Sequence, residues 1–191
     1  PDILHECDLM EDAAVAHGFD NLPKTFPQTN TVGGPLPINK LGDVIRHQCA
    51  QSGWLEVLPL ILCSHDENFG WMNRSDDGKT AIVLENPKTS EYQIVRTSLL
   101  PGILKTIREN KNHALPVQVF EVSDVAFKDA GEKQRMARNE RHVAAIYCNK
   151  AAGFEIVHGL LDKLMMMLDV PRIFNGDEKA QRGYYLREAE D

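Results

Sequence analysis

A loop, a helix and a strand, in that order, form the clearest pattern of this chain, between residues 86 and 129. Helical spacing relates four apolar positions: Leu100, Ile103, Leu104 and Ile107. Ser98 is placed to cap this helix, and Pro101 suits its first turn. After a polar break at residues 110–116, the β-branched run over 117–127 predicts a strand that is buried on both faces.

Helical periods also precede and follow this centre. A helix is predicted from Ile38, and Gly53 ends it. One apolar face of this helix is formed by Ile38, Leu41, Val44, Ile45 and Cys49. Residues 54–63 then predict one strand, in which Pro59 indicates an edge or a bulge. A second long helix over 153–170 stops before Pro171. Its apolar positions are Phe154, Val157, Leu160, Leu161, Leu164, Met165 and Leu168.

Local signals predict the connecting elements. Ser64 and Glu67 have the spacing of a capping box, which opens a short helix through Trp71. The expected short strands are residues 80–84, 142–148 and 184–187, and the expected turns and loops are residues 76–78, 128–141 and 172–182. Basic side chains in the loop 128–141 either contact nucleic acid or are simply solvated, and the solvated interpretation is favoured.

The first 22 residues carry a group of carboxylates: Asp2, Asp8, Glu11 and Asp12. Asp8 and Glu11 predict a capping box for a helix that ends at Gly18. Acidic side chains favour a helix N-terminus without any ligand, so the pattern alone leaves metal binding as the second interpretation. Residues 23–37 are rich in proline and predict a linker, and the glycine pair at 33–34 lacks the Lys-Ser/Thr of a phosphate loop.

Composition narrows the class of protein. The 191 residues are enough for one substantial core and a small appendage. A net charge of -7 argues against a general phosphate-binding surface. No apolar run approaches the roughly 20 residues of a membrane helix, and no signal-peptide pattern opens the chain. Four widely spaced cysteines are typical of reduced thiols in a cytosolic protein: Cys7, Cys49, Cys63 and Cys148. The first residue, Pro1, leads us to expect a piece of a longer protein.

Common catalytic patterns are missing from the sequence. The seven histidines are dispersed, with no His-x-x-x-His pair, and no Gly-x-Ser-x-Gly elbow occurs. His47, His142 and His158 fall within periodic segments, which favours core or surface roles over ligand roles. We therefore expect no independent catalyst in this chain.

The order of helix and strand around the centre resembles the core of class II aminoacyl-tRNA synthetases. The wording Val-Arg-Thr-Ser-Leu-Leu-Pro-Gly-Ile-Leu at 95–104, followed by Val-Phe-Glu-Val at 119–122, is closer still to the beta subunits of phenylalanine–tRNA ligases. The resemblance implies an α+β fold, an antiparallel β-sheet flanked by helices, as a catalytically inactive copy of the class II domain. It also implies that residues 1–22 end a small B5-like domain, that 23–37 form a linker, and that 38–191 form the synthetase-like B6-B7 domain, truncated at its C-terminus.

Resemblance also gives expectations for single residues. A class II synthetase holds the ATP phosphate with arginines in the motif 2 pattern Glu-Ile-Gly-Arg-x-Phe-Arg-x-Glu. Aligned at residues 120–122, this chain has Asp124 and Phe127 at the two arginine positions, and it has no Gly-x-Gly-x-Gly-x-x-Arg motif 3. Arg96 is expected to be a structural hydrogen-bond donor. The helix from Ile38 corresponds to motif 1, which builds subunit interfaces, although an ordinary core helix has the same pattern.

The carboxylates near the N-terminus match a magnesium site that the family shares between its two subunits. Asp2, Asp8 and Glu11 match directly, Asp12 replaces a second glutamate, and the ligation is expected to run partly through water. The resemblance implies no catalytic and no cofactor-binding residue in this chain, with ATP bound only through the alpha subunit. It implies a cytoplasmic α2β2 heterotetramer that acts on tRNA(Phe), no membrane, and a supporting role for this domain.

Two alternatives stay open at this point. A self-sufficient enzyme would need a cationic clamp for phosphate, which the strand at 117–127 lacks. A stand-alone interaction or metal-binding module, without a role in aminoacylation, would need none.

Overall fold

The computed structural model describes residues 2–29, 31–174 and 183–187. The chain divides into two compact units, Pro1–Gly34 and Pro35–Asp191. The division falls inside the predicted linker at 23–37. The assignment of residues 1–22 to a preceding domain stays a prediction.

The first unit is built on one helix, α1 (Glu6–His17), followed by the single turn η1 (Phe19–Asn21). The helix ends at Gly18, whose φ of 92° suits glycine, as predicted. The predicted cap was wrong, because His5 and not Asp8 is the N-cap residue. Asp8 instead lies in the first turn and accepts hydrogen bonds from the amides of Leu4 (2.8 Å) and His5 (2.9 Å).

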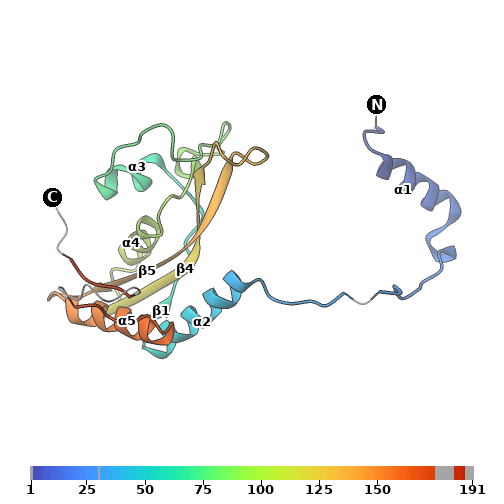
Figure 1. Cartoon of the computed structure of the whole chain (residues 1–191). Helices are drawn as coiled ribbons and strands as arrows, with labels where there is room; N and C mark the ends of the chain where they lie inside the picture. Colours follow the sequence, from blue (N-terminus) through green and yellow to red (C-terminus); the bar gives the residue numbers. More distant parts are fainter. Residues whose placement is uncertain (1, 30, 175–182, 188–191) are drawn as a thin grey trace. The chain divides into compact units, whose positions relative to one another are not determined.

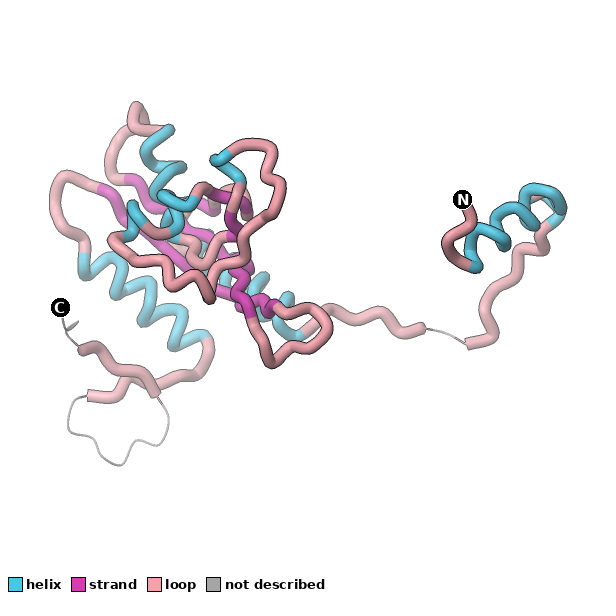
Figure 2. The backbone as a smooth tube through the Cα atoms, turned by 90° about the horizontal axis from the view of Figure 1, so that it is seen from above, coloured by secondary structure: helices cyan, strands magenta, loops and turns pink. Residues whose placement is uncertain are grey.

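The second unit is organised on a long antiparallel ribbon, β4 (Val117–Lys128) and β5 (Ala137–Cys148). The short strand β1 (Leu55–Glu56) pairs in parallel with β4, and β2 (Leu62–Cys63) pairs in antiparallel with β3 (Ile94–Val95). Figures 1 and 2 show the ribbon running along this unit. The predicted fold class, α+β with helices flanking an antiparallel sheet, is confirmed, and β1 adds one parallel pair.

Helices cover both faces of the ribbon (Figure 1). On one face, α2 (Pro37–Gln51) and α5 (Phe154–Met167) pack in a cluster of Ile45, Cys49, Trp54, Phe120, Val122 and Leu160. On the other, α4 (Leu100–Glu109) and its cap residue Leu99 pack in a cluster of Leu99 and Ile103 with Val119 and Val125 of β4. The remaining short helices are α3 (His65–Asn68), η2 (Gly70–Met72) and η3 (Ser90–Tyr92). The prediction that β4 is buried on both faces is therefore confirmed at its centre.

The single strand expected over residues 54–63 is wrong. The segment forms β1 and β2, which belong to different sheets. Pro59 lies between them and has no amide hydrogen to continue a ladder, so the backbone changes sheets there. The strand expected over residues 80–84 is also wrong, because only Val83 forms a bridge, to Ile94.

The hairpin loop expected at residues 128–141 is shorter than predicted, because its last part, from Ala137, belongs to β5. The ribbon pairs from Val117 with Cys148 to Lys128 with Ala137, which leaves only 129–136 as the turn. Several of the first residues of β5 are charged, which favours a loop in the sequence. They can still form a strand, because an antiparallel pair can expose one face to water. Of the strand expected at residues 184–187, only a bridge between Tyr184 and Arg172 is present, and most of the loop expected at 172–182 lies outside the described residues.

The local capping signals gave mixed results. The box at α3 is confirmed, since the Glu67 amide donates to Ser64 Oγ (3.1 Å) and the Ser64 amide to Glu67 Oε2 (3.0 Å). At α4 the cap residue is Leu99, although Ser98 Oγ accepts from the Leu100 amide at 3.3 Å.

Glycine has a packing role in α4. A Cβ added at Gly102 would stand 2.7 Å from the Cβ of Pro59, whereas one added at Gly159 in α5 would have no neighbour within 4 Å. We expect Gly102→Ala to lower the free energy of unfolding by about 1–3 kcal/mol, because the helix must move away. Gly159→Ala is expected to raise it by about 0.5–1 kcal/mol through helix propensity. Urea unfolding measures both, and equal stabilisation would contradict the close contact at Gly102.

Candidate functional site

Arg96 forms the most buried ion pair of the described residues. It follows β3, and its side chain lies against β4, where Nη1 donates to Glu121 Oε1 at 2.7 Å. Its Nε and Nη2 donate to the carbonyl oxygen of Asp124 at 3.2 and 3.1 Å. The side chains of Arg96 and Glu121 are 5% and 0% exposed. The prediction that Arg96 is a structural donor is confirmed, because every one of these contacts is internal.

Glu121 is only half satisfied by this pair. Its second oxygen, Oε2, is buried and has no hydrogen-bond partner among the residues that the structure describes. Burial raises the pKa of Glu121, and the neighbouring Arg96 guanidinium and the Ser123 side chain oppose this rise without cancelling it. Burying this carboxylate therefore lowers the stability of the fold, and the ion pair with Arg96 reduces that loss.

A second arginine, Arg46, extends from α2 to Glu56, the last residue of β1. Its Nε and Nη2 contact the two oxygens of Glu56 at 2.5 and 2.9 Å, and its Nη1 contacts Asp43 at 3.2 Å. The fork of two parallel contacts to one carboxylate is the strong geometry for this pair. The positive charge of Arg46 is thus directed at two carboxylates of its own chain.

A third arginine, Arg141 of β5, crosses the ribbon to α2. Its Nε contacts Asp124 Oδ1 at 2.5 Å, and its Nη2 donates to Asn39 at 3.2 Å. Gly42 makes room for it, since a Cβ there would stand 2.7 Å from Nη1 of Arg141. Asp124, which the resemblance aligns with an arginine of the synthetases, therefore binds an arginine itself.

These three arginines line one cavity of about 520 Å³, here called the arginine cavity. Its charged lining consists of Arg46, Arg96, Arg141, Asp43, Glu56, Glu121 and Asp124. Three guanidinium groups meet four carboxylates, which gives a formal charge of −1 when all are ionised. An anion such as a phosphate would have to displace carboxylates from these arginines before binding.

The second position that aligns with a synthetase arginine, Phe127, also carries no charge. The guanidinium of Arg138 lies 5.2 Å from the centre of its ring. Arg138 is itself paired with Glu140 at 2.9 Å and Asp129 at 3.5 Å. The guanidinium that lies over this ring is therefore already bound to carboxylates.

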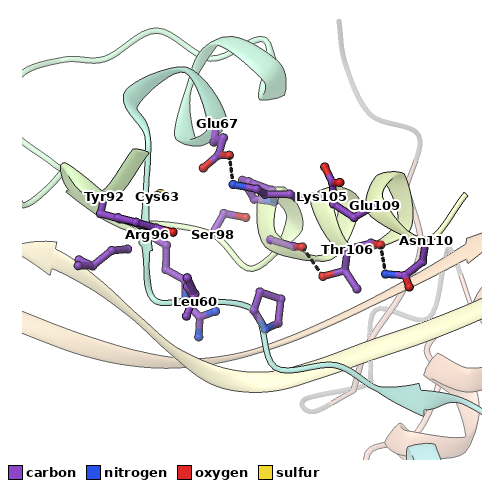
Figure 3. A pocket seen from close by; sticks show the side chains of 14 residues that line it. Leu60, Cys63, Glu67, Tyr92, Arg96, Ser98, Lys105, Thr106, Glu109 and Asn110 are labelled. Atoms are coloured by element: carbon purple, nitrogen blue, oxygen red, sulfur yellow. Dashed lines mark hydrogen bonds and ion pairs between the residues drawn. The ribbon is translucent and has the colours of Figure 1, made fainter. Parts of the chain in front are cut away.

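A smaller cavity of about 280 Å³ lies beside α4 (Figure 3). Lys105 Nζ donates to Glu67 Oε1 at 2.6 Å across it. Burial acts to raise the pKa of Glu67, but the hydrogen bonds from Lys105 and the Ser64 amide outweigh it and hold that pKa below its ordinary value. Thr106 and Asn110 are bonded to backbone carbonyls. The polar side chains drawn with dashed contacts in Figure 3 are thus bonded to each other or to the backbone of α4, which suits an apolar group better than a phosphate.

The predicted metal ligands all belong to the first unit. Asp2 precedes α1, and Asp8, Glu11 and Asp12 follow one another at helical spacing on it. Hydrogen bonds from the amides of Leu4 and His5 lower the pKa of Asp8 and occupy its Oδ2. Among the described residues no three such side chains converge on one point. Their oxygens suit magnesium chemically, but they would need ligands from outside this unit, and the magnesium site stays a prediction.

The cysteines are free thiols. Burial raises the pKa of Cys49 and of Cys63 to about 11, which keeps both protonated and unreactive at neutral pH. None of the helices in the described parts of the chain combines the length and apolar character that a bilayer crossing requires.

Solved structures show the fold class independently. A pyrrolysyl-tRNA synthetase of Desulfitobacterium hafniense matches 71% of this chain and 48% of its own, with a TM-score of 0.59 and 11% identity. A second structure of that synthetase matches 68% and 46%, with a TM-score of 0.56 and 12% identity. The second unit therefore has the fold of a class II aminoacyl-tRNA synthetase domain.

Sequence relatives narrow this class to one family. Residues 22–188 match the family described as phenylalanyl tRNA synthetase beta chain CLM domain, so the chain belongs to that family. The phenylalanine–tRNA ligase beta subunit of Schizosaccharomyces pombe is 56% identical over 100% of this chain and 32% of its own length. Those of Saccharomyces cerevisiae and Homo sapiens are 55% and 43% identical over 98% and 99% of this chain, and 32% and 31% of their lengths. The chain spans about a third of these relatives, and the predicted family resemblance is confirmed.

The sequence singles out Arg96, Asp124 and Phe127 but does not predict which side chains pair with Arg96 or with Asp124. One signal did point to Glu121, which interrupts the apolar run between Phe120 and Val122. A carboxylate inside a buried strand needs a cation, because its burial is costly without one.

Proposed function

We propose that this chain is the non-catalytic, synthetase-like part of a phenylalanine–tRNA ligase beta subunit and supports the catalytic alpha subunit. The complete enzyme attaches phenylalanine to tRNA(Phe) with ATP in the cytoplasm, and the alpha subunit binds the ATP. The observation that carries this proposal is the state of the three arginines at the sheet. Each is bound to carboxylates of its own chain, which leaves support as the function of the domain.

An exposed apolar surface supports a docking role. Three of the five apolar residues predicted on the face of α2 are exposed, and only Ile45 and Cys49 are buried. The segment after α2 exposes further apolar side chains. We call the exposed apolar side chains of α2 and of this segment the docking surface: Ile38, Leu41, Val44, Leu55, Leu58, Leu60 and Ile61. Large apolar side chains that are exposed this close together in the sequence favour a contact with another protein.

The alpha subunit is the partner that this surface takes in an α2β2 heterotetramer. Within this assembly, the ribbon and α2 would hold the alpha subunit in place. Asp2, Asp8, Glu11 and Asp12 would contribute oxygen ligands to a magnesium ion that the alpha subunit shares. That ion would supply fixed positive charge between the subunits.

Co-expression of the chain with the alpha subunit tests the proposal. We expect one complex in size-exclusion chromatography with light scattering. Leu58→Asp, a charge placed in the docking surface, should weaken it at least tenfold, because the carboxylate must be desolvated on binding. The matched control Val83→Asp, at an exposed apolar position outside this surface, should assemble as the wild type does.

Failure of the wild-type chain to form any complex would contradict the proposal. It would favour the alternative of a stand-alone interaction or metal-binding module.

A further inference from the structure

The arginine cavity contains one acceptor that lacks a donor. Glu121 lines the cavity and is 0% exposed, and its Oε2 has no hydrogen-bond partner among the described residues. Its other oxygen is taken by Arg96. An unpaired buried acceptor is unfavourable, so a hydrogen-bond donor brought to this place would be stabilised there.

The charges around the cavity also favour a cation. Four carboxylates against three arginines leave one negative charge in surplus when all of them are ionised. The side chains of Asp43 and Asp124 are 68% and 42% exposed at its opening, so this surplus is accessible from outside. A lysine or arginine head group would bring donors and a positive charge together, whereas an anion would meet the surplus carboxylate.

The opening of the cavity indicates what carries the cation. Leu58 and Ile61 line the cavity as well, and they are 75% and 59% exposed. A free metal ion or small amine would leave these two side chains in water. A basic side chain on the surface of a protein would fill the cavity and cover Leu58 and Ile61 at the same time.

We propose that the arginine cavity receives a lysine or arginine side chain of the alpha subunit, as a charge-selective anchor within the docking surface. This inference rests on the proposed function, because it identifies a contact of that same assembly. The anchor gives the otherwise apolar surface its specificity, since a partner with an acidic or neutral residue at this place would leave the surplus charge unpaired.

Charge reversal at the opening tests the anchor. Asp43→Arg places a fourth guanidinium at the cavity, and it should weaken binding of the alpha subunit at least tenfold, because like charges then meet. Asp66→Arg is the matched control on α3, where the side chain is 86% exposed and does not line the cavity, and it should change the affinity less than twofold. Affinity is measured by biolayer interferometry on the full chain at several salt concentrations.

A neutral substitution distinguishes a loss of charge at the cavity from misfolding of the Asp43→Arg variant. Asp43→Asn should give an intermediate loss of affinity and a shallower salt dependence, with an unchanged unfolding midpoint. Unchanged assembly of Asp43→Arg, beside a wild type that assembles, would overturn the anchor and leave the proposed function standing. Binding of free arginine amide that Asp43→Arg abolishes, while assembly is unchanged, would assign the cavity to a small amine and also overturn the anchor. A wild type that does not assemble would overturn both proposals.

Discussion

Replacing Arg96 by methionine is expected to destabilise the second unit by about 3–5 kcal/mol, which is a large part of the stability of a domain. The substitution leaves the carboxylate of Glu121, 0% exposed, without a cation. It also removes the two donors to the carbonyl oxygen of Asp124. Urea unfolding followed by tryptophan fluorescence measures the loss, because Trp54 is buried in the core.

The pH dependence of this loss has a definite sign. Burial raises the pKa of Glu121 above its ordinary value of 4.5, so the folded chain binds that proton more tightly than the unfolded chain. Without Arg96 the pKa rises further. Below pH 4.5 the carboxyl is protonated in both states and the penalty is small. It grows as the pH rises through the raised pKa, so Arg96→Met should cost most at neutral pH.

The control for Arg96 is Arg135→Met, which breaks a solvent-exposed pair with Glu132 in the turn of the ribbon. Its expected cost is about 0–1 kcal/mol. The double substitution Arg96→Met with Glu121→Gln should recover part of the loss, because it removes the unpaired charge. Equal costs for Arg96→Met and Arg135→Met would contradict the account of the buried pair.

Replacing Phe120 by alanine is expected to cost about 3–5 kcal/mol. Phe120 of β4 is the largest fully buried side chain described, and it packs in the cluster that joins α2 and α5 to the sheet. The truncation leaves a hole that neighbours on two helices and a strand cannot fill together. Thermal unfolding by circular dichroism, with urea unfolding for the free energy, measures the effect.

Phe154→Ala is the matched control for Phe120→Ala, because the same ring is removed at a position that is 66% exposed on α5. Its expected effect is within about 0.5 kcal/mol. A small effect of Phe120→Ala would mean that α2 and α5 are not held on the sheet as described.

Much of the fold was predictable from local patterns. The strand β4, the helices α2, α4 and α5, and the capping box of α3 all depend on residues near one another in sequence, where spacing is informative. The break between β1 and β2 was not predictable in this way. The break arises because β1 pairs with β4 whereas β2 pairs with β3. The sequence of a short apolar run does not indicate which strand it pairs with.

The candidate site shows the same division. The types of residue at positions 124 and 127 were readable directly, and they already argued against a phosphate clamp. The contacts of Arg96 with Glu121, and of Arg141 with Asp124, join residues 25 and 17 positions apart, so only the folded chain shows them. The exposure of Ile38, Leu41 and Val44 was equally hidden, because an interface face and a core face have the same helical period.

We infer that the described residues of this synthetase-shaped domain offer no cationic binding site for the phosphates of a nucleotide. Isothermal titration of magnesium-ATP into the chain alone tests it most directly. The account predicts no saturable binding with a Kd below about 1 mM, because the three arginines at the sheet stay bound to their carboxylates. Saturable binding of one ATP per chain, abolished by substitution of Arg96 or Arg141, would contradict it.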